Sequence, residues 1–228
     1  MVEVQSTFYR LPRDTTMRRW RETAPTSFEF VVKAWQAITH PSSSPTWRGA
    51  RPKVGKGEAA RYGYLQPTAE NFDAFSRTLD VCNALGARVC LIQCPPSFQA
   101  NPKNVRNTGR FLTEIDRGGL IIAWEPRGNW LAKPLLIRAL CDKLEIVHVV
   151  DLLRRDPASS MRLVYSRLHG LGEREVNYGH RYADNELQRL ARKLFSLEKD
   201  GCEEAYILFN NVSMFEDAKR FLKLISGT

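Results

Sequence analysis

The sequence predicts an α/β fold of the TIM-barrel type, a (β/α) barrel built as one domain over residues 1–228. Three observations support this prediction. Seven short apolar segments alternate with stretches of helical spacing, which indicates βαβ units around a parallel sheet. No GxGxxG or GxxxxGK[ST] loop is present, which argues against an open nucleotide-binding sheet. The length of 228 residues is enough for one large α/β domain or for two small ones.

The expected strands are rich in Val, Ile, Leu, Phe and Tyr, the composition that strands prefer. They span residues 2–9, 28–34, 87–93, 119–125, 145–151, 163–169 and 205–211. A closed barrel of this class normally has eight strands in about 250 residues. Because this chain begins directly in a strand, its seven strands look like an eight-fold barrel without the usual first βα unit.

The stretches between the strands carry apolar residues at helical spacing and end on helix-stop signals. In one of them Phe72, Phe75 and Leu79 share a side, and Gly86 follows as a typical helix end. The expected helices span residues 15–24, 70–86, 104–117, 133–144, 185–200 and 212–226.

The composition indicates a globular protein of a reducing compartment. No apolar run approaches the roughly 20 residues that span a bilayer, and the N-terminus lacks the pattern of a secretion signal. We therefore expect a cytoplasmic protein with no membrane partner. The five cysteines form no CxxC pair and are expected as reduced thiols. A net charge of +9 is typical of proteins that meet anions such as nucleic acid or phosphorylated substrates.

One connection, at about residues 39–67, is long and basic, and it leaves a strand end. Trp47, Tyr62 and Tyr64 lie among its basic residues, a mixture that suits a phosphate backbone with stacked bases. A long loop on this face of a barrel is where active sites form, although a merely solvated loop is the alternative. Its basic residues are Arg48, Arg51, Lys53, Lys56 and Arg61.

Polar residues occur at alternate positions of several strands and at their carboxyl ends. In a parallel barrel one strand face packs on the helices and the other lines the interior. Glu3, Gln5 and Thr7 share one face of the first strand, and Arg167 and His169 share a face of a later one. Further polar residues end their strands at Lys33, Gln93, Glu125, Asp151 and Asn210. We expect these side chains to converge on one ligand, because catalytic groups of barrels sit at this edge.

The stretch GLIIAWEPRGNW places Glu125 at the tip of an apolar strand. A buried carboxylate needs a cation or strong donors, so its candidate partners are Arg127, Arg167, Lys33 or a bound ligand. Pro126 stiffens the exit, which gives Arg127 a defined direction. A structural salt bridge that fills the barrel interior is the alternative.

Two of the four histidines suit chemistry. His169 precedes Gly170 at a strand end and is a candidate acid–base group. His40 begins the long loop and is a candidate for contact with a ligand, whereas His148 and His180 read as structural and surface residues. No metal and no cofactor are expected, since the lysine and arginines of the same rim would repel a cation.

The motifs VEVQSTFYRLP, KAWQAITH, IQCPPSF, WEPRGNW, YSRLHG and FNN resemble, in order, the YecE-like family, also called domain of unknown function 72. The resemblance covers almost the whole chain. It implies a TIM-type barrel related in shape to sugar-isomerase and apurinic-endonuclease barrels, and it implies no settled activity. The positions that it marks are Glu3, Gln5, Thr7, Tyr9, Lys33, Gln93, Pro95, Glu125, Arg127, Trp130, Arg167, His169, Gly170, Asn210 and Asn211.

One departure from the family concerns the N-terminus. The family usually begins with an earlier strand that carries a glycine-serine-glycine type motif. Either the start was assigned too far downstream, or the barrel is open by one strand. In the second case the strand that begins at Val2 has an exposed edge, so both a monomer and a homodimer are expected states.

Three functions fit these residues. The first is an enzyme, a hydrolase or lyase, acting on a phosphate-bearing or nucleic-acid substrate, with Glu125 and His169 as the catalytic pair. The second is a non-catalytic nucleic-acid or phospho-ligand binding protein. The third is a sugar or sugar-phosphate enzyme in which Trp124 and Trp130 stack on the sugar. The expected substrate-binding residues are Glu3, Gln5, Thr7, Tyr9, Lys33, His40, Gln93, Arg127, Trp130, Arg167, Asn210 and Asn211.

Overall fold

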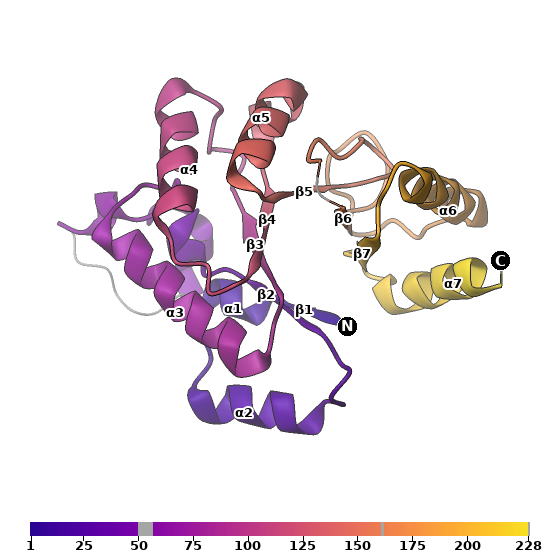
Figure 1. Cartoon of the computed structure of the whole chain (residues 1–228), viewed down its shortest axis with the longest axis horizontal. Helices are drawn as coiled ribbons and strands as arrows, with labels where there is room; N and C mark the ends of the chain where they lie inside the picture. The colour runs from indigo at the N-terminus through magenta and orange to yellow at the C-terminus, as the bar shows by residue number, and fades with distance from the viewer. Residues whose placement is uncertain (50–56, 161, 228) are drawn as a thin grey trace. The chain divides into compact units, whose positions relative to one another are not determined.

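The computed structural model describes residues 1–49, 57–160 and 162–227 (Figure 1). The chain divides into two compact units, an N-terminal unit, Met1–Ile146, and a C-terminal unit, Val147–Thr228. The single domain expected from the sequence stays a prediction. Among the described residues, no helix combines the length and the apolar character that a membrane crossing requires.

The N-terminal unit is built on four parallel strands that pair in chain order. They are β1 (Val2–Val4), β2 (Phe30–Lys33), β3 (Val89–Gln93) and β4 (Ile121–Glu125). Cys90 pairs with Val32 on one side and with Ile122 on the other, and the three are fully buried. Parallel strands that are buried on both faces have nearly continuous apolar sequences. These strands can therefore be recognised from the sequence alone.

Helices join these strands, with helix signals at several ends. The helices are α1 (Ser6–Tyr9), α2 (Asp14–Thr23), α3 (Ala69–Leu85), α4 (Pro102–Glu114) and α5 (Pro134–Leu144). The Thr68 hydroxyl caps α3 by accepting from the Asn71 amide, and Gly86 ends it in the left-handed conformation. The Asn101 side chain caps α4 in the same way, ahead of Pro102.

The predicted first strand, residues 2–9, is wrong beyond Val4. Gln5 takes the α-helical conformation and opens the one-turn helix α1. The Thr7 hydroxyl donates to the carbonyls of Val4 and Lys33, at 2.7 Å each, and so links the ends of β1 and β2. A hydroxyl that bonds backbone carbonyls locally offers the chain an alternative to a continued ladder.

The long connection after β2 contains ordered turns in its described part. Three short 3-10 helices occur, η1 (Gln36–Ile38), η2 (Pro45–Gly49) and η3 (Ala59–Arg61). Residues 63–65 then return and donate backbone hydrogen bonds to Ala37, Ile38 and Thr39 at 2.7 to 3.0 Å. Arg51, Lys53 and Lys56, three of the expected basic residues, lie outside the described residues.

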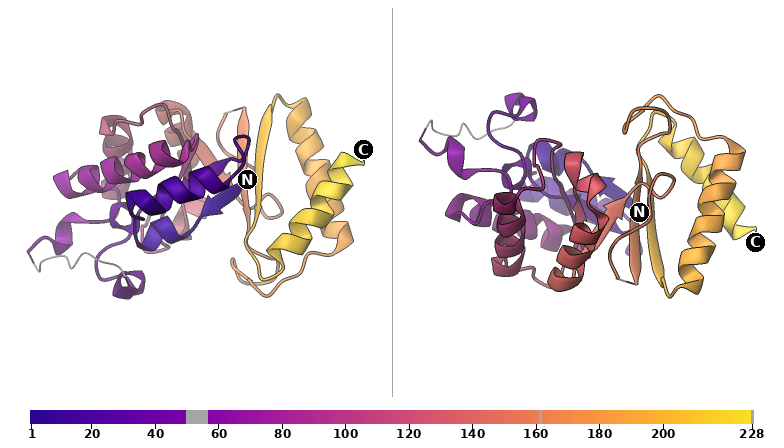
Figure 2. Two further views of the ribbon diagram at one scale, coloured as in Figure 1. Left: turned by 90° about the horizontal axis from the view of Figure 1, so that it is seen from below. Right: turned by 90° about the horizontal axis from the view of Figure 1, so that it is seen from above.

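The C-terminal unit holds the parallel strands β5 (Val147–Val150), β6 (Leu163–Leu168) and β7 (Glu204–Phe209), with the helices α6 (Asp184–Lys199) and α7 (Met214–Ser226). Figure 2 shows both helices along one side of these strands. Val164 and Leu168 of β6 face them in an apolar core with Leu190 and Phe221. Tyr165 pairs with Tyr206 of β7, and their rings stack at 5.7 Å.

All five cysteines are free thiols, and four of them are buried. Burial raises the pKa of Cys94 and of Cys141 to about 12, so both remain protonated thiols at neutral pH. Within residues 1–49, 57–160 and 162–227, no three His, Cys, Asp or Glu side chains gather in a way that would hold a metal ion.

Candidate functional site

Three of the predicted polar residues end adjacent strands of the N-terminal unit. Lys33 is the last residue of β2, Gln93 of β3 and Glu125 of β4, and Gln93 pairs directly with Glu125 in the sheet. Because the strands are parallel, all three side chains lie at the same edge. Lys33 is 6% exposed and Glu125 5% exposed. Charged groups that are this deeply buried require hydrogen-bond or ion-pair partners. Both Lys33 and Glu125 have such partners.

Arg127 is the partner of Glu125. Its Nε and Nη2 atoms donate to Oε1 of Glu125 at 2.8 and 2.6 Å, and Nη2 also donates to Oε1 of Gln93 at 3.3 Å. The backbone directly after Arg127 has a conformation that requires a glycine. Gly128 has φ +66°, and a Cβ atom there would lie 2.5 Å from the Pro96 carbonyl oxygen. The close approach to Pro96 therefore fixes the path of the chain at Gly128, directly after Arg127.

Lys33 lies among residues at the end of β1. Its Nζ atom donates to Oε1 of Gln5 at 3.2 Å and lies 4.2 Å from the centroid of the Phe8 ring, a cation–π geometry. The Gln5 amide in turn donates to the Glu3 carboxylate. Glu3, Gln5 and Lys33 thus form one chain of polar contacts along the ends of β1 and β2.

His40 is held neutral beside the two cations. Its pKa is lowered from 6.5 to about 3, by burial first and then by the positive charges of Lys33 and Arg127. The ring packs edge-on against Phe8 at 4.9 Å, and Nδ1 lies 2.8 Å from the Thr39 hydroxyl. The charges of Lys33 and Arg127 therefore both disfavour the protonated form of this buried imidazole. We call Glu3, Gln5, Lys33, His40, Gln93, Glu125 and Arg127 together the N-terminal rim.

Three other predicted ligand contacts of this unit lie elsewhere. Trp130 is wholly buried, its indole N–H donates to the Phe98 carbonyl at 2.7 Å, and its ring packs on Phe98 and Trp124. Thr7 is also wholly buried, and its hydroxyl is used between β1 and β2. Tyr9 is half exposed at the end of α1, in a helical turn and not in the predicted strand. Trp130 and Thr7 support the rim from within the core.

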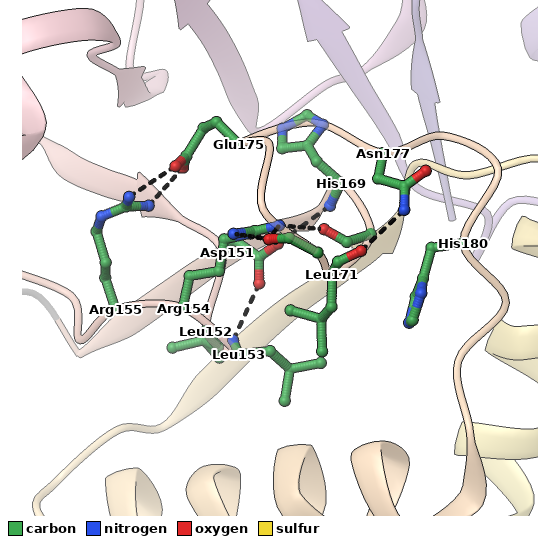
Figure 3. A network of polar contacts seen from close by, with 12 residues as sticks. Asp151, Leu152, Leu153, Arg154, Arg155, His169, Leu171, Glu175, Asn177 and His180 are labelled. Atoms are coloured by element: carbon green, nitrogen blue, oxygen red, sulfur yellow. Dashed lines mark hydrogen bonds and ion pairs between the residues drawn. The ribbon is translucent and has the colours of Figure 1, made fainter.

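In the C-terminal unit, the strand ends place His169 between two polar side chains. The Asp151 carboxylate accepts from the backbone N–H of His169 at 3.2 Å and from that of Leu153 at 3.0 Å (Figure 3). Asn210 follows β7, and its Nδ2 atom lies 3.0 Å from Nδ1 of His169. Burial, opposed by these N–H groups, raises the pKa of Asp151.

Arg154, which is absent from the residues predicted from sequence, holds the loop after His169. Its Nη2 atom donates to the carbonyls of Gly170 at 2.7 Å and Arg174 at 2.8 Å. The neighbouring Arg155 forms a two-point ion pair with Glu175. In the sequence Arg154 lies four residues after the end of β5, and no local signal there marks its contact with the loop that follows His169.

Arg167 and Asn211, the remaining predicted contacts, are both 2% exposed. Arg167 shares the strand face of Tyr165, opposite Val164 and Leu168, as the alternation predicts. The Asn211 amide donates to the His180 carbonyl and to Asp217, at 2.7 Å each, and so ties the start of α7 in place. Glu125 and His169, the expected catalytic pair, belong to different units, and their pairing stays a prediction.

A family model described as "Protein of unknown function DUF72" matches residues 1–227. The chain belongs to the DUF72 family. The resemblance seen in the motifs is thus confirmed, since YecE-like is another name for this family. A curated relative, the UPF0759 protein YunF of Bacillus subtilis, is 26% identical over 256 residues, covering 99% of this chain and 83% of its own length.

Solved structures share the fold at low identity. A DUF72 family protein from Enterococcus faecalis has a TM-score of 0.69 at 18% identity, over 99% of this chain and 89% of its own. A xylose isomerase domain containing protein from Salmonella typhimurium has a TM-score of 0.54 at 15% identity, over 93% and 80%. A D-tagatose 3-epimerase-like protein gives 0.54 at 14%, over 94% and 84%. These likenesses confirm the α/β, TIM-type class of this DUF72 protein.

Proposed function

We propose that the N-terminal rim binds a small phosphate-bearing ligand, with Lys33 and Arg127 as its cations. One observation carries the proposal: the cations Lys33, at the end of β2, and Arg127, just after the end of β4, lie at the same strand-end edge of one parallel sheet. An ammonium group and a guanidinium group among polar groups that are already oriented can hold an anion through charge-assisted hydrogen bonds. Membership of the DUF72 family leaves the reaction open.

Charge pairing limits how strong this anion site is. Arg127 is bound to Glu125, so part of its charge is compensated in the absence of a ligand. The contacts of Lys33 with the Gln5 amide oxygen and the Phe8 ring hold its ammonium group in position at the rim. We propose that Lys33 and Arg127 both contact the phosphate group of the ligand.

Glu125 is the residue of the rim best suited to acid–base chemistry. Two N–H groups of Arg127 donate to one oxygen of Glu125 and so fix the orientation of the carboxylate. A general base must be held within reach of the proton that it transfers, and a bidentate guanidinium provides this restraint. We propose Glu125 as the proton-transfer group for a substrate whose phosphate is held by Lys33.

A small ligand is favoured over nucleic acid because the aromatic residues of the long loop are used in packing. Trp47 contacts the rings of Trp35 and Tyr62, and its indole N–H donates to the His40 carbonyl at 3.2 Å. Tyr64 stacks on Phe98 at 5.8 Å. Base stacking on a protein requires aromatic faces that a base can reach, and these rings already pack against neighbouring side chains.

The test is calorimetric titration of the protein with inorganic phosphate, a hexose phosphate, the same hexose without phosphate, and a single-stranded oligonucleotide. Lys33→Gln should weaken phosphate-ester binding at least about tenfold, since a buried charged contact contributes roughly 1.5–3 kcal/mol. Lys103→Gln, at an exposed lysine of α4, is the matched control and should bind as the native protein does.

Three results would contradict the proposal. Equal binding of the hexose and its phosphate would remove the need for an anion site. Binding of the oligonucleotide alone would favour the nucleic-acid alternative. Loss of phosphate binding in Lys103→Gln to the same degree as in Lys33→Gln would place the anion on the general basic surface.

A further inference from the structure

We infer that Asn210 holds His169 as the neutral Nε2–H tautomer, which makes His169 a hydrogen-bond donor at Nε2 and not a general base. The inference goes beyond the proposed function, because it concerns the C-terminal unit and does not depend on the ligand of the N-terminal rim. It starts from the 3.0 Å contact between Nδ2 of Asn210 and Nδ1 of His169.

The chemistry of the two nitrogens decides the direction of this contact. The nitrogen of a carboxamide carries two hydrogens and accepts no hydrogen bond. Nδ1 of His169 must therefore accept, and it needs its lone pair to do so. In a neutral imidazole the proton then sits on Nε2. An imidazolium would set an Nδ1–H against the N–H of Asn210, two donors facing each other.

The carboxylates near His169 do not occupy the Nδ1 position. Asp151 accepts from the backbone N–H of His169, not from its ring. Glu175 is held by two nitrogens of Arg155, as Figure 3 shows. A carboxylate at Nδ1 would accept a hydrogen bond from an Nδ1–H group and so leave the lone pair on Nε2 as a base. The amide of Asn210 sets the opposite arrangement.

Both partners are fixed through their backbones. The N–H of Asn210 donates to the Leu168 carbonyl at 2.8 Å, which continues the pairing of β6 with β7. The carbonyl of His169 accepts from Asn177 at 2.8 Å, and the next N–H, that of Gly170, donates to the Tyr182 hydroxyl at 2.7 Å. His169 is 6% exposed, so its ring has little room to turn away.

This tautomer determines what His169 can do. A neutral imidazole with its proton on Nε2 donates to a carbonyl or phosphoryl oxygen and stabilises negative charge that develops there. It does not take up a proton at Nε2. Asn210 is then a positioning residue, since it acts on the chemistry only through the state of the His169 ring.

The test is the NMR spectrum of the protein labelled with ¹⁵N in its histidines. His148 serves as the internal reference, because the backbone N–H of Ala158 donates to its Nδ1 at 3.0 Å and so fixes the Nε2–H tautomer. His169→Gln assigns the His169 signals by their loss. We expect His169 at neutral pH to show the Nε2–H pattern of His148.

The variant Asn210→Asp should reverse the tautomer. Its carboxylate accepts a hydrogen bond, so His169 should gain a proton on Nδ1 while the signals of His148 stay unchanged. Asn210→Ala is the second variant, in which both tautomers should be populated. A native His169 that carries its proton on Nδ1 would overturn the inference, and so would a His169 pattern that both variants leave unchanged.

Discussion

Arg127 contacts a single oxygen of Glu125 with two of its nitrogens, at 2.8 and 2.6 Å. The residues are two positions apart, on either side of Pro126, and Arg127 is still extended, so both side chains lie on the same side of the chain. Glu125 is almost completely buried, and Arg127 keeps a fifth of its side-chain surface. The pair therefore lies at the boundary between the core of the N-terminal unit and its surface.

Glu125→Gln should destabilise the protein by about 1–3 kcal/mol. The amide keeps one acceptor for Arg127 but removes the negative charge that the guanidinium contacts at this buried position. Urea unfolding measures the effect. Glu114→Gln removes an exposed carboxylate from the Arg110–Glu114 pair of α4 and should change the stability by less than about 0.5 kcal/mol. Equal losses in the two variants would show that the Glu125 pair is no more than a surface contact.

Gly128→Ala should destabilise the protein by about 3 kcal/mol or more, because the new Cβ would collide with the Pro96 carbonyl. Gly86 is the matched control. Its φ of +62° is close to the +66° of Gly128, and nothing lies within 4 Å of a Cβ built there. Gly86→Ala should therefore show only the conformational penalty of about 1 kcal/mol. Thermal unfolding compares the two, and similar losses would contradict the close contact between the turns after β3 and β4.

The stability of the protein should depend on His40 between pH 6.5 and pH 3. The pKa of His40 is about 3 when folded and 6.5 as a model value, so the unfolded chain takes up a proton first as the pH falls. The stability present above pH 6.5 is therefore lost as the pH is lowered through this window. From pH 7 to pH 5 the loss attributable to His40 is about 2 kcal/mol.

His40→Gln tests this dependence, because glutamine keeps a polar group without titrating. Urea unfolding of the native protein and the variant at pH 8, 7, 6 and 5 gives the difference in stability between them. This difference should be constant from pH 8 to 7 and should narrow by about 2 kcal/mol at pH 5. Parallel curves over the whole range would show that His40 is not held neutral in the folded protein.

Arg154→Met should loosen the loop after His169, since the guanidinium donates to the carbonyls of Gly170 and Arg174. Hydrogen exchange of the amides in residues 170–177 should become at least about tenfold faster, the equivalent of roughly 1.4 kcal/mol in local opening. Arg155→Met is the neighbouring control. It removes only a partly exposed ion pair with Glu175 and should change the exchange by much less. Equal exchange in the two variants would contradict the role given to Arg154.

The sequence predicts the strands and helices well because their signals are local. Six of the seven strands lie where runs such as VCLIQ and IIAWE are found, and Gly86 marks a helix end by its own chemistry. The predicted first strand is too long because Glu3, Gln5 and Thr7 alternate with apolar residues. A helical turn buries Thr7 equally well once its hydroxyl bonds two strand-end carbonyls.

Part of the candidate site also follows from strand ends alone. Lys33, Gln93 and Glu125 could be predicted because a polar residue that closes a buried apolar strand lies at the edge where barrel sites form. The roles of Arg154 and Asn210 could not, because each depends on the direction of a side chain toward a distant backbone or ring. The burial of Trp130 likewise depends on Phe98, which is 32 residues away in the sequence.

The most direct test of the proposed anion site observes His40 while inorganic phosphate is added at constant ionic strength. The His40 ring and the Lys33 ammonium group both pack against the Phe8 ring, so an anion bound at Lys33 should shift the His40 NMR signals along a saturating curve. The signals of His180, which contacts Glu186 in the other unit, serve as the reference. We predict saturation in the native protein and no shift in Lys33→Gln. A His40 signal that stays still, or that moves equally with chloride, would contradict the account.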